Sequence, residues 1–118
     1  MTEDDLLDLF RPLAPVSLKK MFGGISVYVE GLIVAIAIDG AVYMKADTET
    51  KPQFQAAGLT PFSYEAKGKT ATMNYWALPE EAYEDPDSLR PWFRLALEAA
   101  RRAGASKPKK AKKALKPS

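Results

Sequence analysis

The stretch Lys19-Lys20-Met21-Phe22-Gly23-Gly24 leads directly into a run of strand-like sequence. It combines two cationic side chains, two large apolar side chains and two glycines. A Gly-Gly pair inside strand-like sequence is typical of a β-bulge or of a close approach between backbones. We therefore expect this stretch to form a bulge in one long first strand, over residues 16–29, and to bend that strand into a sheet.

Turn signals that contain glycine divide the sequence after this stretch into further strands. A pair such as Asp39-Gly40 between two apolar runs is a strong indicator of a hairpin. The runs between the turns contain many β-branched and aromatic residues, which favour strands. Strands are expected over residues 32–38, 41–46, 62–65 and 70–78, with turns at Glu30-Gly31, Asp39-Gly40 and Lys67-Gly68-Lys69.

Helical patterns lie before, between and after these strands. Thr2 and Asp5 have the spacing of a capping box, and Leu89 begins an apolar stripe at helical spacing. The order α-βββ-α-ββ-α predicts an α+β fold, a two-layer sandwich in which helices cover one face of a mostly antiparallel, five-stranded sheet. Helices are expected over residues 3–11 and 50–57, as one turn at 79–84, and from Asp85-Pro86 or Ser88 to a stop at Gly104.

The composition of the 118-residue chain argues against several classes of enzyme. Without cysteine or histidine, it lacks thiolate nucleophiles, disulfides, the commonest general base and the commonest transition-metal ligand. We therefore expect neither catalysis nor a bound cofactor or metal. The acidic N-terminus and the short longest apolar run, residues 32–38, argue against a secretory signal and a membrane span, so we expect a cytoplasmic protein.

The net charge of +2 conceals two regions of opposite sign. Residues 1–100 hold nine basic and fifteen acidic residues, a balance of −6, and the remainder carries eight basic residues and no acid. We expect residues 1–104 to form the domain and residues 105–118, a Lys/Pro/Ala-rich tail, to be disordered. The basic residues predict sequence-independent contact with DNA or RNA through phosphate neutralisation, or else a solubilising tail that folds back onto the acidic body. They are Arg101, Arg102, Lys107, Lys109, Lys110, Lys112, Lys113 and Lys116.

Alternation along the strands predicts what each face of the sheet carries. The face without helices is expected to be aromatic and apolar, and such a patch marks a contact surface. A homodimer is the first explanation. A small ligand or nucleotide stacked on the rings is the second, and cover by a helix or by the tail is the third. A slip of one residue exchanges the two faces of a strand. The residues expected on the face without helices are Ser26, Tyr28, Ile33, Ala35, Ala37, Tyr43, Lys45, Thr72, Asn74 and Trp76, and those expected toward the helices are Val27, Val29, Leu32, Val34, Ile36, Ile38, Val42, Met44, Met73 and Tyr75.

Two charged clusters each have a structural and a chemical interpretation. Lys19 and Lys20 beside Gly23-Gly24 can hold an anion in a nest of backbone N–H groups. The structural interpretation, which we favour, is that Met21 and Phe22 are core residues, that the glycines shape the strand and that at most one of the two lysines points outward. The second cluster consists of acidic residues, which can hold a divalent cation. Acidic residues also stabilise the first turn of a helix, and we favour this structural explanation. The residues of this cluster are Glu80, Glu81, Glu84, Asp85 and Asp87.

Several separated motifs resemble one known family. Besides residues 19–24 they are Tyr28-Val29-Glu30-Gly31, Val42-Tyr43-Met44-Lys45-Ala46-Asp47, Phe54-x-x-x-Gly58-x-x-Pro61-Phe62-x-Tyr64 and Met73-Asn74-Tyr75-Trp76-x-x-Pro79. In this order, over about residues 5–100, they resemble the N-terminal domain of the TfoX/Sxy competence regulators. The resemblance implies a small bacterial α/β domain that takes part in transcriptional regulation of DNA uptake. It favours a non-enzymatic regulatory or interaction domain with a protein partner, and the alternative is a small-ligand-binding domain that uses the open aromatic sheet face.

Overall fold

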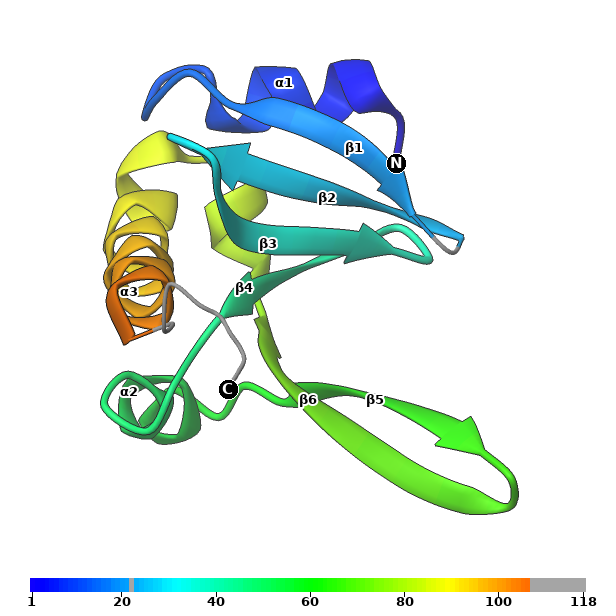
Figure 1. The fold of residues 1–118 in the computed structure, drawn as a ribbon. Coiled ribbons are helices and arrows are strands. Elements are labelled where there is room, and N and C mark those ends of the chain that lie inside the picture. Colours follow the sequence, from blue (N-terminus) through cyan, green and yellow to red (C-terminus); the bar gives the residue numbers. More distant parts are fainter. Residues whose placement is uncertain (22, 107–118) are drawn as a thin grey trace.

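In the computed structural model, which describes residues 1–21 and 23–106, helices pack against one face of an antiparallel sheet (Figure 1). The predicted α+β class is therefore confirmed. The elements in chain order are α1 (Glu3–Phe10), β1 (Ser17–Met21), β2 (Gly24–Val29), β3 (Leu32–Ile38), β4 (Ala41–Lys45), α2 (Lys51–Ala56), β5 (Pro61–Ala66), β6 (Lys69–Ala77), the 3-10 turn η1 (Glu80–Tyr83) and α3 (Pro86–Ser106).

The described part of the sheet has six strands in the order β1-β2-β3-β4-β6-β5. The prediction of five strands is wrong because the expected long first strand is two strands. β1 and β2 are antiparallel partners whose register ends at Met21 opposite Gly24, so the chain reverses direction here instead of bulging. Gly23 has a φ of +68°, in the left-handed region that glycine adopts without strain.

Gly24 provides the close backbone approach that the Gly-Gly pair predicts. It lies opposite Ile38 of β3. A Cβ atom at this position would lie 2.5 Å from the carbonyl oxygen of Ala37 and 2.8 Å from Cγ1 of Ile38. The start of β2 can therefore pair this closely with β3 only if residue 24 has no side chain.

The predicted hairpin turns are confirmed, and they share one conformation. Both residues of each turn have positive φ, from 54° to 80°. Two consecutive residues with positive φ form the turn whose twist matches that of the flanking strands. The turns are Glu30-Gly31, Asp39-Gly40 and Lys67-Gly68.

The helices begin where side chains cap them. Thr2 and Asp5 form the expected capping box of α1, with the hydroxyl of Thr2 accepting from the backbone N–H of Asp5 at 3.1 Å. The carboxylate of Asp85 accepts from the backbone N–H of Asp87 and from the hydroxyl of Ser88, both at 3.1 Å, so α3 begins at Pro86. Within the described residues, no helix combines the length and the apolar character needed to cross a bilayer.

α3 does not stop at Gly104, as the sequence predicts, but continues to Ser106. A Cβ atom on Gly104 would lie 3.1 Å from Cδ2 of Leu32. This glycine therefore allows α3 to lie close to β3, and it does not end the helix.

The hydrophobic core lies between the helices and one face of the sheet. Leu6 and Phe10 of α1, Phe54 of α2, and Leu89 and Phe93 of α3 are buried in it. The rings of Phe10 and Phe93 lie 6.0 Å apart. These contacts cover one face of the strands, and none of the described helices covers the other.

β5 and β6 extend away from the body of the molecule as a hairpin, which we call the arm (Figure 1). β4 pairs with β6 only where Tyr43 to Lys45 lie opposite Tyr75 to Ala77. The backbone N–H of Ala46, just after β4, also donates to the carbonyl of Asn74 at 2.8 Å. In the described structure, the part of β6 before Asn74 therefore has only β5 as a sheet partner.

Candidate interaction surface

The register of the strands assigns each strand residue to one face of the sheet, because opposed residues in antiparallel strands point to the same side. One row of opposed residues is buried against the helices. It consists of Val27, Ala35, Met44 and Trp76.

The adjacent row, displaced by one residue, points to the side without helices, which we call the open face. This row consists of Ser26, Ile36, Tyr43 and Ala77. The same alternation and the contacts below place further large side chains there. The large apolar and aromatic residues of the open face are Tyr28, Ile33, Ile36, Tyr43, Phe62, Tyr64, Met73 and Tyr75.

In β3, the structure corrects part of the predicted assignment. Tyr28, Ile33, Tyr43 and Lys45 lie on the open face as expected, but Ala35 and Ala37 face the helices. The cause is a β-bulge: Val27 pairs with Ala35 while Tyr28 pairs with Ile33, so that Val34 is an extra residue. Beyond the bulge the alternation shifts by one residue. Ile36 and Ile38, which were expected toward the helices, therefore turn to the open face.

The two faces of β6 are exchanged relative to the prediction. Trp76 lies opposite Met44, and its ring packs 6.1 Å from Phe54, so it faces the helices. Asn74 is on the same side and lines a depression beside Asp47 and Arg102. Thr72, Asn74 and Trp76 therefore leave the open face, and Met73 and Tyr75 take their place.

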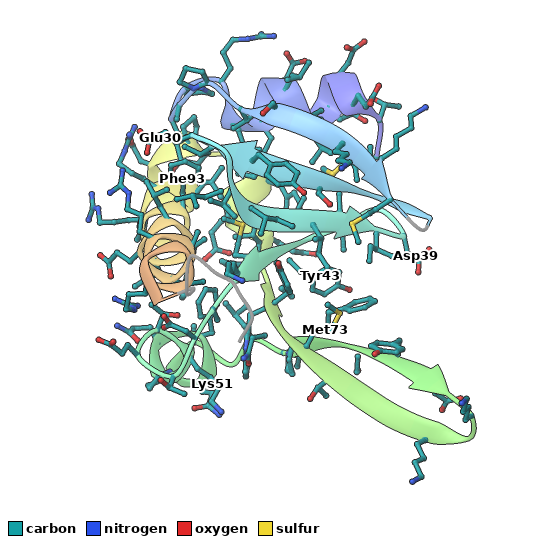
Figure 2. The ribbon with its side chains drawn as sticks, viewed as in Figure 1. Glu30, Asp39, Tyr43, Lys51, Met73 and Phe93 are labelled. Carbon is teal, nitrogen blue, oxygen red and sulfur yellow. The ribbon has the colours of Figure 1, made fainter. Side chains whose placement is uncertain are left out.

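Aromatic rings form a continuous row from β4 onto the arm. The ring centroids of Tyr43 and Phe62 are 5.1 Å apart, and those of Phe62 and Tyr64 are 6.2 Å apart. Tyr64 is 46% exposed and Met73 is 37% exposed. Figure 2 shows Tyr43 and Met73 on the same side, between β4 and the arm, with Phe93 away from them at α3. The alternation of Phe62 and Tyr64 in the sequence contained this signal, but the prediction did not use it.

The central part of the open face is well packed although no helix within residues 1–21 and 23–106 covers it. Ile36 is only 1% exposed. The hydroxyl of Ser26, which is buried, donates to the sulfur of Met21 at 2.7 Å. Burial raises the pKa of Tyr75, and the nearby phenol of Tyr28 raises it further. The open face therefore has a well-packed centre, and its outer aromatic ring, Tyr64, is accessible to solvent.

Lys45 places a positive charge beside an aromatic ring of the open face. It lies opposite Tyr75 in the register, and its Nζ is 5.3 Å from the centroid of the Tyr75 ring. This distance is within the range of a cation–π interaction. Lys19 also lies on the open face, opposite Ser26, but Lys20 lies opposite Ile25 on the other face.

This separation bears on the anion nest suggested for residues 19–24. Adjacent residues of a strand point to opposite sides, so Lys19 and Lys20 do not converge on one ion. Both lysines are exposed because β1 is an edge strand, and the expectation that at most one points outward is wrong. Phe22 lies outside the described residues.

Two of the eight basic residues proposed for nucleic-acid contact lie on α3 and form ion pairs. Nε of Arg102 lies 2.7 Å from Oδ2 of Asp47, and its Nη2 lies 3.0 Å from Oδ1. This bidentate hydrogen bond lowers the pKa of Asp47 to about 2. Arg101 lies 3.4 Å from Glu30. The six lysines from Lys107 to Lys116 lie outside the described residues.

The acidic cluster at residues 80–87 has a structural role in the described chain. Asp85 caps α3, as shown above, and Glu80 and Glu81 lie in the first turn of η1. Across residues 1–21 and 23–106, no three acidic side chains come together in a group that would hold a metal ion.

Comparison with known proteins places this fold in a family context. The family model described as the TfoX N-terminal domain matches residues 8–100. The chain is also similar to a protein of Aliivibrio fischeri named DNA transformation protein TfoX1, with 26% identity over 99 residues, which cover 84% of this chain. The match covers 47% of that relative, so the chain spans about half of its length.

Proposed function

Because the chain belongs to the TfoX N-terminal domain family, we propose that it is a non-enzymatic regulatory domain that acts in the control of DNA uptake by binding a partner through the open face. The name of the Aliivibrio fischeri relative, a DNA transformation protein, supports the process. The absence of histidine and cysteine from the sequence supports a binding role over a catalytic one.

The observation that carries this proposal is the row of rings on the side of the sheet without helices. The ring of Phe62 contacts both Tyr43 and Tyr64, and Tyr64 is nearly half exposed. Aromatic residues are enriched in binding hot spots, and exposed apolar patches mark interaction sites.

Natural transformation in the bacterium that carries this chain tests the proposal. Replacing Tyr43 and Tyr64 by serine should lower the transformation frequency about tenfold or more, because two hot-spot residues are lost. Transcripts of the DNA-uptake genes should fall in parallel. A matched control is Leu7→Ser, at a 37% exposed apolar residue of α1, which should change neither quantity. An unchanged transformation frequency in the double variant and in a deletion strain would overturn the proposal.

The basic residues beyond the described chain belong to the same proposal. Lys107, Lys109, Lys110, Lys112, Lys113 and Lys116 would add sequence-independent affinity for nucleic acid by releasing counterions from phosphates. Replacing all six by glutamine should weaken binding to random duplex DNA and flatten its dependence on salt. Equal and salt-insensitive binding by both forms would contradict this role.

A further inference from the structure

The lysines of the described strands are distributed unequally between the two faces of the sheet: three of the four lie on the open face, and Lys20 lies on the other. Lys19 and Lys45 lie on the open face by their register. Lys69 lies there too, because Ala71, two residues along β6, is opposite Tyr64. In the described part of the chain, no strand residue that the register assigns to the open face is an Asp or Glu.

The excess of lysines on the open face contrasts with the negative net charge of residues 1–100. Residues 1–100 carry a net charge of −6. Their acids lie mainly on the helical layer and in the connections, among them Asp4 of α1 and Glu81 of η1. The aromatic face is thus the part of the sheet that complements an anionic partner.

The arrangement of the rings narrows the chemistry of that partner. The rings of Tyr43, Phe62 and Tyr64 form a row in which neighbouring rings are in contact. Lys45 on β4 lies near the Tyr43 end of this row, and Lys69 on the arm lies near the Tyr64 end. Aromatic surfaces bordered by cations bind single-stranded nucleic acid, in which unpaired bases can stack while phosphates approach the lysines. The bases of a duplex are stacked on each other and are not accessible to such a surface.

We propose that the open face binds single-stranded nucleic acid. Bases stack on Tyr43, Phe62 and Tyr64, and Lys19, Lys45 and Lys69 attract the backbone phosphates. This inference rests on the proposed function, since it names the class of partner that binds the surface proposed there.

A second copy of the chain is the alternative occupant, which the sequence also predicts as a homodimer. A dimer formed by two open faces would be isologous, with the same residues on both sides. It would bury the rings, but it would also bring the lysines of one copy toward those of the other, and the face holds no strand carboxylate to compensate. The distribution of charge therefore favours nucleic acid over self-association.

Fluorescence anisotropy with the full chain and a labelled oligo(dT) of about 12 nucleotides tests this proposal. We expect Tyr64→Ala to weaken binding about tenfold, and Tyr43→Ala with Tyr64→Ala to weaken it more, because each ring that stacks on a base contributes separately. Lys19→Ala should reduce the slope of log affinity against log salt by about 0.7, the value for one phosphate contact on a single strand.

The matched controls are residues that lie away from the open face. Lys20→Ala changes the neighbouring charge of β1, but on the other side of the sheet, and should leave both affinity and salt slope unchanged. Leu7→Ala removes a 37% exposed apolar side chain from α1 and should also have no effect. Circular dichroism and the unfolding midpoint establish that each variant is folded. An oligo(U) of the same length shows whether RNA or DNA is preferred, and tight binding of either supports the proposal.

Two results would overturn the inference. In the first, the tyrosine variants bind oligo(dT) as the parent does, and Lys19→Ala and Lys20→Ala have equal effects, so that binding resides in the basic residues after 106. In the second, sedimentation velocity gives a dimer that Tyr64→Ala converts to a monomer without a change in oligonucleotide affinity, so that a second copy occupies the face. The transformation assay is independent of both results. If the tyrosine variants lose transformation but still bind the oligonucleotide, the proposed function is retained and single-stranded nucleic acid is rejected as the partner.

Discussion

Gly24 decides at the scale of a single residue whether the start of β2 can pair with β3. Its missing side chain leaves room for the carbonyl of Ala37, which a Cβ atom would approach to 2.5 Å. Gly23 differs because a Cβ atom there would meet nothing within 4 Å, and only its positive φ restricts it.

Substitution of these two glycines by asparagine, which tolerates the left-handed region, should therefore destabilise the fold to different extents. We expect Gly24→Asn to lower the free energy of unfolding by about 2 kcal/mol or more, because backbone must move. Gly23→Asn should cost less than about 1 kcal/mol. Urea unfolding of both variants measures the difference, and equal costs would show that close packing at Gly24 is not limiting.

Asp47 predicts a pH dependence of stability. Its pKa falls from 3.8 to about 2 in the folded chain, first because Arg102 forms a hydrogen bond with it. A carboxyl with a lowered folded pKa stabilises the fold fully above its unfolded pKa, and this contribution is lost as the pH falls through the folded pKa. Asp47→Asn should therefore cost about 1 kcal/mol at neutral pH, after allowing for partial exposure.

The difference between Asp47→Asn and the parent should disappear between about pH 4 and pH 2. The amide oxygen of asparagine can still accept from the backbone of Glu49 and Thr50, but its NH2 group cannot accept from Nε of Arg102, so the variant removes the charge and one hydrogen bond of the bidentate pair. Asp8→Asn is a suitable control, since Asp8 forms its ion pair with Arg11 at an exposed site. A pH-independent cost at Asp47 would contradict this assignment.

At the scale of elements, α3 contains an internal proline. The Asp85 cap places the start of the helix at Pro86, so Pro91 lies beyond the first turn, where the sequence alone would not place it. Proline there lacks the N–H that bonds to the preceding turn. Pro91→Ala should raise the free energy of unfolding by about 1 kcal/mol or more. Thermal unfolding measures this change, and a lower midpoint would show that the proline ring is needed for packing.

The elements also show what the sequence could and could not predict. Local signals such as Asp39-Gly40 and the Thr2–Asp5 capping box predicted turns and helix starts correctly, because they act over a few residues. The faces of β3 and β6 depend on partners distant in the chain. The bulge at Val34 arises in the pairing of two strands, and the orientation of Trp76 follows from packing on Phe54. Neither is encoded by alternation when both faces of a strand are apolar.

At the scale of the whole molecule, an acidic helical layer lies behind a sheet face that carries aromatic rings and lysines. The candidate surface was half predicted: Tyr28, Ile33, Tyr43 and Lys45 were assigned to it from the sequence. The alternation of Phe62 and Tyr64 in the sequence was not used, but their contact with Tyr43 depends on how β5 and β6 pair beyond β4, which alternation within one strand does not predict. The arm lengthens the face, and it gives the surface its most exposed ring.

Mapping of backbone amide chemical shifts distinguishes binding at the open face from binding at the residues after 106. The ¹⁵N-labelled full chain is titrated with oligo(dT) of about 12 nucleotides, and the shifts are assigned to residues. We expect the largest chemical-shift changes at strand residues of the open face, around Tyr28, Tyr43 and Tyr64, and little change at Leu7 or Asp85. Changes confined to the end of α3 and the residues after 106 would contradict this expectation.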